Sequence, residues 1–318
     1  MYKVPILITV YNRPDLFKKL LTNLKKNKPS KIYIKGDGPK NEIDRKKIKS
    51  IKKIISLIDW KCKIFNNFSS VNVGCRKSVT EGLNWFFSKE KFGIILEDDC
   101  LPNVSFFRYC EILLKKFYNN KRIYTISGSN FQNHDNNKYD YYFSKYPHCW
   151  GWASWRRAWK LNDPNLSFWP KWKRTYEWNR YHKTLIEKKY WEKIFDKVYN
   201  EKIDSWAYVW TASVWKNNGI TATPRISLIN NIGFDNRATH TLNTQKKLKR
   251  NIKNLKFPLK HPKIIQLNKE ADKYTFGSHF KGIYYLWPLR FIHLIDLFLM
   301  NPKIFIIRTY KKLLSHYV

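Results

Sequence analysis

The first 130 residues alternate between short apolar runs and amphipathic stretches, and this alternation restricts the fold more than any other feature. The apolar runs have the length and composition of buried strands and lie at 4–10, 31–35, 62–65, 92–96 and 123–127. The stretches between them repeat apolar residues every three or four positions, as helices do, and lie at 14–24, 42–58, 76–88 and 105–118. Strands that alternate with helices form βαβ units. The sequence therefore predicts an α/β fold with a mostly parallel central sheet flanked by helices.

The strand at 92–96 runs directly into three consecutive carboxylates, Glu97, Asp98 and Asp99. Like charges side by side repel, so a fold rarely places them at a strand end unless a cation or a set of donors lies opposite. Mg²⁺ and Mn²⁺ prefer oxygen ligands and often share them with substrate phosphates. Ligands of α/β proteins also bind at the carboxyl ends of the strands. The triplet indicates either a metal–diphosphate site or an acidic turn in which Asp99 caps a helix that begins near Asn103.

The net charge of the chain indicates an anionic partner without naming it. Lys and Arg number 61 against 24 Asp and Glu, a formal charge of +37. Such a chain attracts nucleic acid, an anionic membrane surface or phosphorylated substrates, so a basic nucleic-acid-binding protein is the alternative function. The basic residues are spread along the chain and no RNP-type, KH or zinc pattern occurs, so no specific nucleic acid is expected. Neither GxGxxG after the first strand nor GxxxxGK[ST] occurs, which disfavours dinucleotide-binding and P-loop domains.

The cysteines and the two ends of the chain bear on its location. The five cysteines are odd in number and form no CxxC pair, and no basic leader precedes the first strand. Both features favour a cytoplasmic protein and disfavour a secreted toxin. Residues 282–318 interleave apolar and cationic side chains and predict an amphipathic helical tail. This tail would either pack on the body or lie on an anionic membrane surface, at the inner face of the cytoplasmic membrane.

The chain changes character beyond residue 140. Tryptophans become dense between 150 and 215, where each would by default fill the core, although those near Trp150 would also suit a sugar site because aromatic faces pack on sugar C–H groups. Helices are expected at 176–199 and 205–217, and strands at 220–230. Residues 246–263 contain basic side chains and no acid, which predicts an exposed linker or a disordered loop.

Seven short segments, in this order, resemble the GT-A-fold glycosyltransferases, and in particular the bacterial hemolytic-protein-like group, which is itself similar to N-acetylglucosaminyltransferase I. The segments are Thr9-Val10-Tyr11-Asn12-Arg13-Pro14, Gly36-Asp37-Gly38-Pro39, Asn72-Val73-Gly74-Cys75-Arg76, Ile95-Leu96-Glu97-Asp98-Asp99-Cys100, Ser127-Gly128-Ser129-Asn130-Phe131, Trp150-Gly151-Trp152-Ala153-Ser154-Trp155-Arg156-Arg157, and Asn231-Ile232-Gly233-Phe234 with Ala238-Thr239-His240-Thr241. The resemblance implies a Rossmann-like GT-A domain over 1–242, with a nucleotide-binding half at 1–130 and an acceptor half at 131–242. A basic linker at 243–281 and the helical tail at 282–318 would follow.

The resemblance also implies the reaction. An inverting, metal-dependent enzyme of this kind moves a sugar from a nucleotide-diphosphate sugar, here expected to be a UDP-sugar, to a hydroxyl of a glycan or glycolipid acceptor in surface polysaccharide synthesis. Thr9, Tyr11 and Arg13 match the loop that contacts the base and the diphosphate. Asp37 matches the acid that hydrogen-bonds the nucleoside, and Arg76 lies in the segment that closes over the nucleotide.

The acidic triplet matches the metal-binding motif of that family. Glu97 and Asp98 would belong to the nucleotide site, with Asp98 on the ribose or on a metal-bound water. Asp99 would ligate Mn²⁺ or Mg²⁺. His240 stands where several of these enzymes place a further metal or phosphate contact, with a surface histidine as the alternative.

The general base is where this chain departs from the family pattern. The family places an acid at the position of Ala207, before an aromatic residue, and a carboxylate there would take the proton of the attacking hydroxyl. Three explanations stay open. Asp204 serves instead, the substitution at 207 is deliberate, or the protein is a weakened or altered transferase. Asp204 is also a plausible N-cap of the helix that follows it.

Overall fold

The computed structural model describes residues 2–133, 138–234 and 252–282, together with isolated positions between 295 and 306. One sheet of eight strands forms its centre, in the order β3-β2-β1-β4-β8-β6-β9-β7. In chain order these strands are β1 (Ile6–Val10), β2 (Lys31–Gly36), β3 (Lys63–Phe68), β4 (Phe92–Glu97), β6 (Ile123–Ser127), β7 (Tyr141–Ser144), β8 (Trp152–Trp155) and β9 (Ile220–Pro224). A separate two-stranded sheet pairs β5 (Cys100–Pro102) with β10 (Ile229–Asn231).

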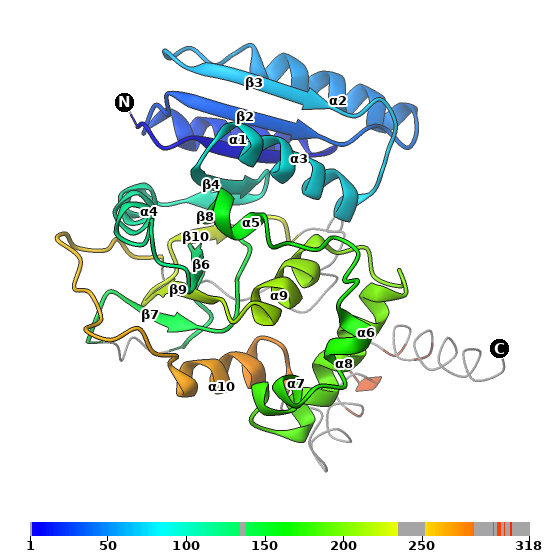
Figure 1. Cartoon of the computed structure of the whole chain (residues 1–318). Coiled ribbons are helices and arrows are strands. Elements are labelled where there is room, and N and C mark those ends of the chain that lie inside the picture. The colour runs from blue at the N-terminus through cyan, green and yellow to red at the C-terminus, as the bar shows by residue number, and fades with distance from the viewer. Residues whose placement is uncertain are drawn as a thin grey trace.

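Ten helices surround these sheets in the described part of the chain (Figure 1). They are α1 (Pro14–Lys25), α2 (Glu42–Ile55), α3 (Cys75–Lys89), α4 (Val104–Lys116), α5 (Arg156–Trp159), α6 (Trp169–Trp172), α7 (Tyr176–Tyr181), α8 (Leu185–Tyr199), α9 (Trp206–Lys216) and α10 (Lys269–Ser278). The alternation of β1 to β4 with α1 to α3 confirms the predicted α/β pattern of the first half.

The large sheet is mixed. Strands β3, β2, β1 and β4 are parallel neighbours, and β6 is parallel to β9. Strand β8 lies antiparallel between β4 and β6, and β7 lies antiparallel at the edge beside β9. Six strands therefore run in one direction and two in the other.

Both faces of the sheet are covered. Ile6, Ile8 and Val10 of β1 point into a core shared with α1, α2 and α4, whereas Leu7 points into a second core shared with α3 and α9. This alternation follows from the two-residue period of a strand. Because β1 is buried on both faces, its sequence is apolar throughout.

The second half differs from the prediction in two places. The segment 176–199 forms two helices because the backbone is extended at His182 and Thr184 starts α8 by accepting a hydrogen bond from the Glu187 N–H. The tryptophan-rich segment after Gly151 forms β8, whose Trp152 and Trp155 are buried core residues, whereas Trp150 is half-buried. Core packing therefore accounts for most of these tryptophans.

Residues 252–282 differ from the exposed linker that was expected. Leu255 and Leu259 are buried, and the Leu255 N–H donates to Ser105 Oγ at 2.9 Å. The segment then forms α10. It packs on the body because its apolar side chains reach the core, although it also contains many lysines. Residues 235–251 and most of 283–318, including the expected tail, lie outside the described residues. No helix within the described ranges is long and apolar enough to span a bilayer.

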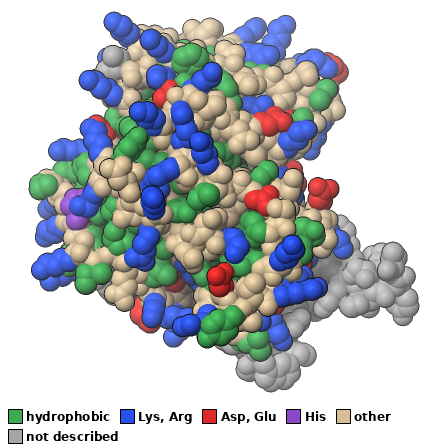
Figure 2. All heavy atoms as spheres, in the orientation of Figure 1, with side chains coloured by type: hydrophobic (Ala, Val, Ile, Leu, Met, Phe, Trp, Pro, Cys, Tyr) green, Lys and Arg blue, Asp and Glu red, His purple; other side chains and the backbone are tan. Residues whose placement is uncertain are grey.

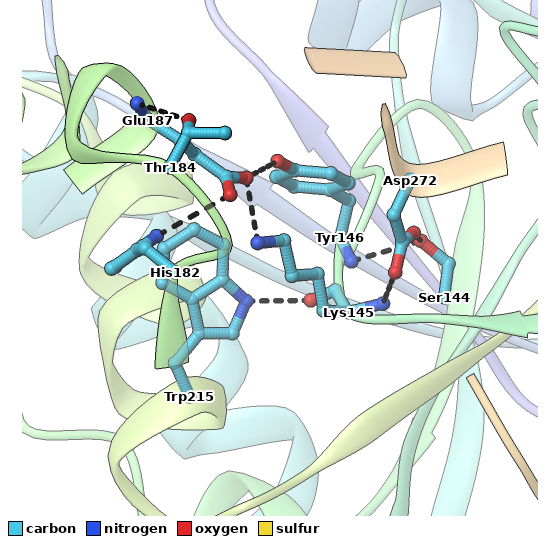
Figure 3. Close-up of polar contacts among 8 residues, drawn as sticks. All are labelled: Ser144, Lys145, Tyr146, His182, Thr184, Glu187, Trp215 and Asp272. Atoms are coloured by element: carbon cyan, nitrogen blue, oxygen red, sulfur yellow. Dashed lines mark hydrogen bonds and ion pairs between the residues drawn. The ribbon is translucent and has the colours of Figure 1, made fainter. Parts of the chain in front are cut away.

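A buried polar network joins α10 to the end of β7 and to α8 (Figure 3). Lys145 Nζ lies 2.6 Å from Glu187 Oε1, and Tyr146 donates a hydrogen bond to the same oxygen. Ser144 Oγ donates to Asp272 Oδ1 at 2.6 Å, and the Lys145 N–H donates to Oδ2 at 3.3 Å. Three consecutive residues at the end of β7, Ser144 to Tyr146, thus contact one carboxylate of α8 and one of α10.

Candidate functional site

The carboxyl ends of β1, β2 and β4 meet at one edge of the sheet. Thr9 of β1 pairs with Glu97 of β4, and Val10 pairs with Gly36 of β2. Because these strands are parallel neighbours, the residues that follow each of them gather at this edge. The structure thereby brings together three of the sequence segments from which the site was predicted.

Arg13 lies against the acidic triplet. Its guanidinium forms an ion pair with Asp98 Oδ1, and its Nη1 lies 2.9 Å from Asp99 Oδ2. Asp98 is 1% exposed and Asp99 is 7% exposed, so both ion pairs are largely shielded from water. A guanidinium has donors on a rigid fork and can therefore hold two carboxylates side by side.

Burial and mutual repulsion disfavour the charged forms of Glu97 and Asp98 in the triplet. Burial and the negative charges of Asp99 and Asp98 raise the pKa of Glu97. Burial also raises the pKa of Asp98, against the charge of Arg13, which acts in the opposite direction. Asp98 Oδ2 is buried and has no hydrogen-bond partner among the described residues. A buried carboxylate oxygen without a donor is costly, so this atom is suited to a further cation or donor.

A segment distant in sequence, at residues 231–233, also holds Asp99 in place. Its carbonyl accepts a hydrogen bond from the Ile232 N–H at 2.9 Å, because β5 pairs with β10. A Cβ added to Gly233 would lie 2.1 Å from Asp99 Oδ2. Only glycine therefore lets this turn pass so close to the carboxylate. The observed helix N-cap is Asn103, which accepts from the Phe106 N–H, so the interpretation of Asp99 as that cap is wrong.

The triplet fits a divalent cation only if other ligands complete it. No group of three His, Cys, Asp or Glu side chains within the described ranges is arranged to hold a metal ion. Asp98 and Asp99 do offer adjacent carboxylates, one of them with a partnerless oxygen. Mg²⁺ usually binds through one or two carboxylates plus substrate phosphates. These residues therefore fit an ion that is shared with a diphosphate. His240 lies outside the described residues.

Asp37 organises the loop that leads into α3. Its Oδ1 accepts from the Gly38 and Val73 N–H groups at 2.8 and 3.0 Å. Its Oδ2 accepts from Asn72 Nδ2 at 2.9 Å and from the Gly74 N–H at 3.1 Å. Four donors from within the chain thus surround the carboxylate expected to contact a nucleoside. Sequence reasoning included Asn72 and Gly74 only in a family-like segment and missed that Asp37 positions them.

The remaining predicted residues of the first loop lie beside this group. Thr9 is buried within β1, and its carbonyl accepts from the Asp98 N–H at 3.2 Å. The Tyr11 hydroxyl donates to Asp44 Oδ2 at 2.7 Å, and Asn12 Nδ2 donates to Asp44 Oδ1 at 2.7 Å. Asp44 lies in the first turn of α2 and was not predicted. It anchors the loop that presents Arg13.

Asp204 and Arg76 connect the two halves of the chain. Asp204 Oδ2 accepts from the Cys75 N–H at 2.8 Å, and Oδ1 accepts from the Arg76 N–H at 2.9 Å. Asp204 therefore caps α3, a helix distant in sequence. The interpretation of Asp204 as the N-cap of the helix that follows it is wrong, because the N-cap residue of α9 is Ser205, which makes no side-chain cap hydrogen bond. The Arg76 guanidinium donates to the carbonyls of Pro164 and Val198. It points into the second half of the chain, and no ion pair joins it to the acidic triplet among the described residues.

Position 207 lies on α9, one residue after Trp206. Hydrogen bonding from Trp206 lowers the pKa of Glu97, although burial outweighs it, so the start of α9 borders the acidic triplet. Ala207 is half-buried and supplies no ionisable group. The nearby Cys75 thiol stays protonated because burial, followed by the charges of Glu97 and Asp204, raises its pKa to about 12. This thiol is therefore no thiolate nucleophile.

Comparisons with known proteins give little beyond the geometry. No family model matches the chain, and no curated protein matches it. Among solved structures, the chain is similar to UDP-glucose pyrophosphorylase complexed with UDP-glucose, at 11% sequence identity and a TM-score of 0.26. The superposition covers 50% of this chain and 71% of that chain. A likeness of this size does not define a shared activity.

Proposed function

We propose that this protein is a glycosyltransferase of the GT-A type, which moves a sugar from a UDP-sugar to a hydroxyl of a glycan or glycolipid. The observation that supports it most is the acidic triplet at the carboxyl ends of parallel strands, with Arg13 beside it and a buried, partnerless oxygen on Asp98. That arrangement suits a diphosphate bound together with a divalent cation. The seven family-like segments support the same proposal.

In this proposal the chain acts mainly by binding and orienting charge. Departure of a nucleoside diphosphate places negative charge on its β-phosphate, and fixed positive charge stabilises that state. Arg13 is the cation of the site that could contact the leaving diphosphate. Asp98 and Asp99 would hold Mn²⁺ or Mg²⁺, which when bound supplies further positive charge at the phosphates. Asp37 fixes the loop at 72–74 that would enclose the nucleoside.

The acceptor hydroxyl requires a base for inversion at the anomeric carbon. Both oxygens of Asp204 already accept N–H hydrogen bonds from α3, which occupies this carboxylate with capping that helix. Position 207 directly follows Trp206 at the start of α9 but bears only a methyl group. The proposed enzyme therefore lacks a free general base, and we expect its turnover to be slow.

The membrane and nucleic-acid partners are separate proposals. Attachment to an anionic membrane would depend on the tail at 282–318, and flotation of full-length and truncated protein with anionic liposomes tests it. Lys and Arg are scattered over the whole face shown in Figure 2 and form no single stripe on it. That distribution gives no specific support for a nucleic-acid groove.

A thermal-shift series tests the proposed function. A ligand at 100 times its Kd stabilises the folded state by about 2.7 kcal/mol, so UDP with Mn²⁺ should raise the Tm, whereas GDP with Mn²⁺ should raise it less. Asp99→Asn should remove the Mn²⁺-dependent part of the shift. Asp59→Asn is the matched control, because Asp59 is an exposed acid that pairs with Lys25, at the opposite end of α1 from Arg13. Equal shifts for all nucleotides, or no shift, would argue against a UDP-sugar enzyme.

A further inference from the structure

Arg13 holds the two carboxylates from which a divalent cation would take its ligands. Its two guanidinium arms engage one oxygen of Asp98 and one of Asp99, and its own side chain is only 17% exposed. Burial disfavours the charged guanidinium, but the two carboxylates outweigh this effect and raise the pKa of Arg13. The positive charge is therefore permanent. A divalent cation that approached these carboxylates would be repelled by it and would find two of their oxygens taken.

The local backbone does not favour a cation at this position. Arg13 is the N-cap residue of α1, and it makes no side-chain cap hydrogen bond there. The N-terminus of a helix has a partial positive charge, so an arginine at this end is held by its carboxylate partners and not by the helix. The same end of α1 would favour an arriving anion such as a diphosphate. The carboxylates and an incoming diphosphate therefore compete for one guanidinium.

We infer that Arg13 makes cation binding conditional on the diphosphate. Without nucleotide, Arg13 closes the Asp98–Asp99 pair to divalent ions. A bound diphosphate draws the guanidinium onto its own oxygens, which frees Asp98 and Asp99 for the ion and adds phosphate oxygens as ligands. Nucleotide and ion then bind with positive coupling. This inference rests on the proposed function for the identity of the anion, but the competition itself follows from the two ion pairs.

Direct measurement of Mn²⁺ binding tests this switch without any assay of turnover. Free Mn²⁺ is followed by electron paramagnetic resonance, first with protein alone and then with saturating UDP. The wild type should bind Mn²⁺ weakly alone and much more tightly with UDP. In Arg13→Gln, Mn²⁺ alone should bind at least ~10-fold tighter than in the wild type, and the gain on adding UDP should shrink, since coupling between two sites is commonly 5- to 150-fold.

Two further variants make the result interpretable. Arg45→Gln is the matched control, because Arg45 lies on the exposed face of α2 and pairs only with Glu42 among the described acids. It should behave as the wild type. Arg13→Lys keeps the charge but not the fork, and should raise Mn²⁺ affinity several-fold without UDP. If circular dichroism shows that Arg13→Gln is unfolded, Arg13→Lys decides.

The outcomes separate this inference from the proposed reaction. Unchanged Mn²⁺ affinity without UDP in the folded Arg13 variants overturns the switch, even if the protein transfers sugar. Tighter Mn²⁺ binding in those variants, with no sugar transfer by the wild type or by Ala207→Asp, supports the switch and overturns the proposed reaction. Absence of Mn²⁺ binding in every protein, with UDP bound, overturns the switch together with the metal site.

Discussion

At the scale of single residues, Asp37 shows how one carboxylate can order a loop. Its oxygens accept four hydrogen bonds, three of them from backbone N–H groups, and the residue is buried. Gly74 has a φ of +88°, a conformation that favours glycine, and its N–H is one of these donors. The loop therefore depends on a charge that lies 37 residues earlier in the chain.

We expect Asp37→Asn to destabilise the protein and to weaken nucleotide binding. The amide of this variant would place an NH₂ group opposite N–H donors. Because hydrogen bonds to a charged group contribute about 1.5–3 kcal/mol each, we expect the free energy of unfolding to fall by roughly 2–4 kcal/mol. Urea denaturation measures the stability, and calorimetry with UMP and UDP measures binding. Asp59→Asn should leave both unchanged. Retention of full stability in Asp37→Asn would show that the loop does not depend on this charge.

A second residue-scale prediction concerns position 207. Ala207→Asp should raise the rate of UDP release with a suitable acceptor, because a general base typically contributes ~100- to 10,000-fold. UDP affinity should change little, since the residue lies on α9 and not at the strand ends. The opposite result, no gain in Ala207→Asp and loss of the existing activity in Asp204→Asn, would assign the base to Asp204.

At the scale of elements, α3 is fixed by contacts from the other half of the chain. Asp204 caps its first turn, and the Arg76 guanidinium reaches the carbonyls of Pro164 and Val198. A carboxylate at a helix N-terminus also complements the helix dipole. The two halves of the chain are therefore joined beside the acidic triplet, on the same side of the sheet as α9.

Loss of this cap should be measurable. Asp204→Ala should lower the free energy of unfolding by about 1 kcal/mol, the usual contribution of an N-cap side chain. Asp204→Asn keeps an acceptor and should lose less. Chemical denaturation at neutral pH gives both values, with Asp59→Ala as the control. Equal stability of Asp204→Ala and wild type would show that the cap adds nothing in solution.

At the scale of the whole molecule, the network in Figure 3 makes stability depend on pH. Burial by itself would raise the pKa of Glu187, but the adjacent His182 ring, whose Nδ1 lies 3.8 Å from Oε2, the charge of Lys145 and the hydrogen bond from the Tyr146 hydroxyl bring it to about 2. A carboxylate whose folded pKa is depressed stabilises the fold above its unfolded pKa, and that contribution is lost as the pH falls toward 2. Burial raises the pKa of Asp272 to about 6, so its effect is opposite: stability falls as the pH rises from about 4 to 6.

Glu187→Gln should therefore remove an acid-sensitive contribution. The shift of Glu187 corresponds to a stabilisation on the order of 3 kcal/mol at neutral pH. The variant should be less stable than the wild type at pH 7, and the difference should narrow between pH 4.5 and 2. Urea denaturation across this range measures it, with the exposed Glu42→Gln as the control. A constant difference at every pH would contradict the assignment to the charge of Glu187.

The sequence by itself determined the alternation of strands and helices in the first half, and it predicted an acidic triplet at a strand end. Both follow from the local spacing of apolar residues and from the order of residues along the chain. Only the tertiary structure decided what lies opposite those acids. Arg13 meets Asp98 across 85 residues, Asp204 caps a helix across 129 residues, and β8 enters the sheet between β4 and β6. Such contacts depend on how whole elements pack, and no local pattern of side chains encodes them.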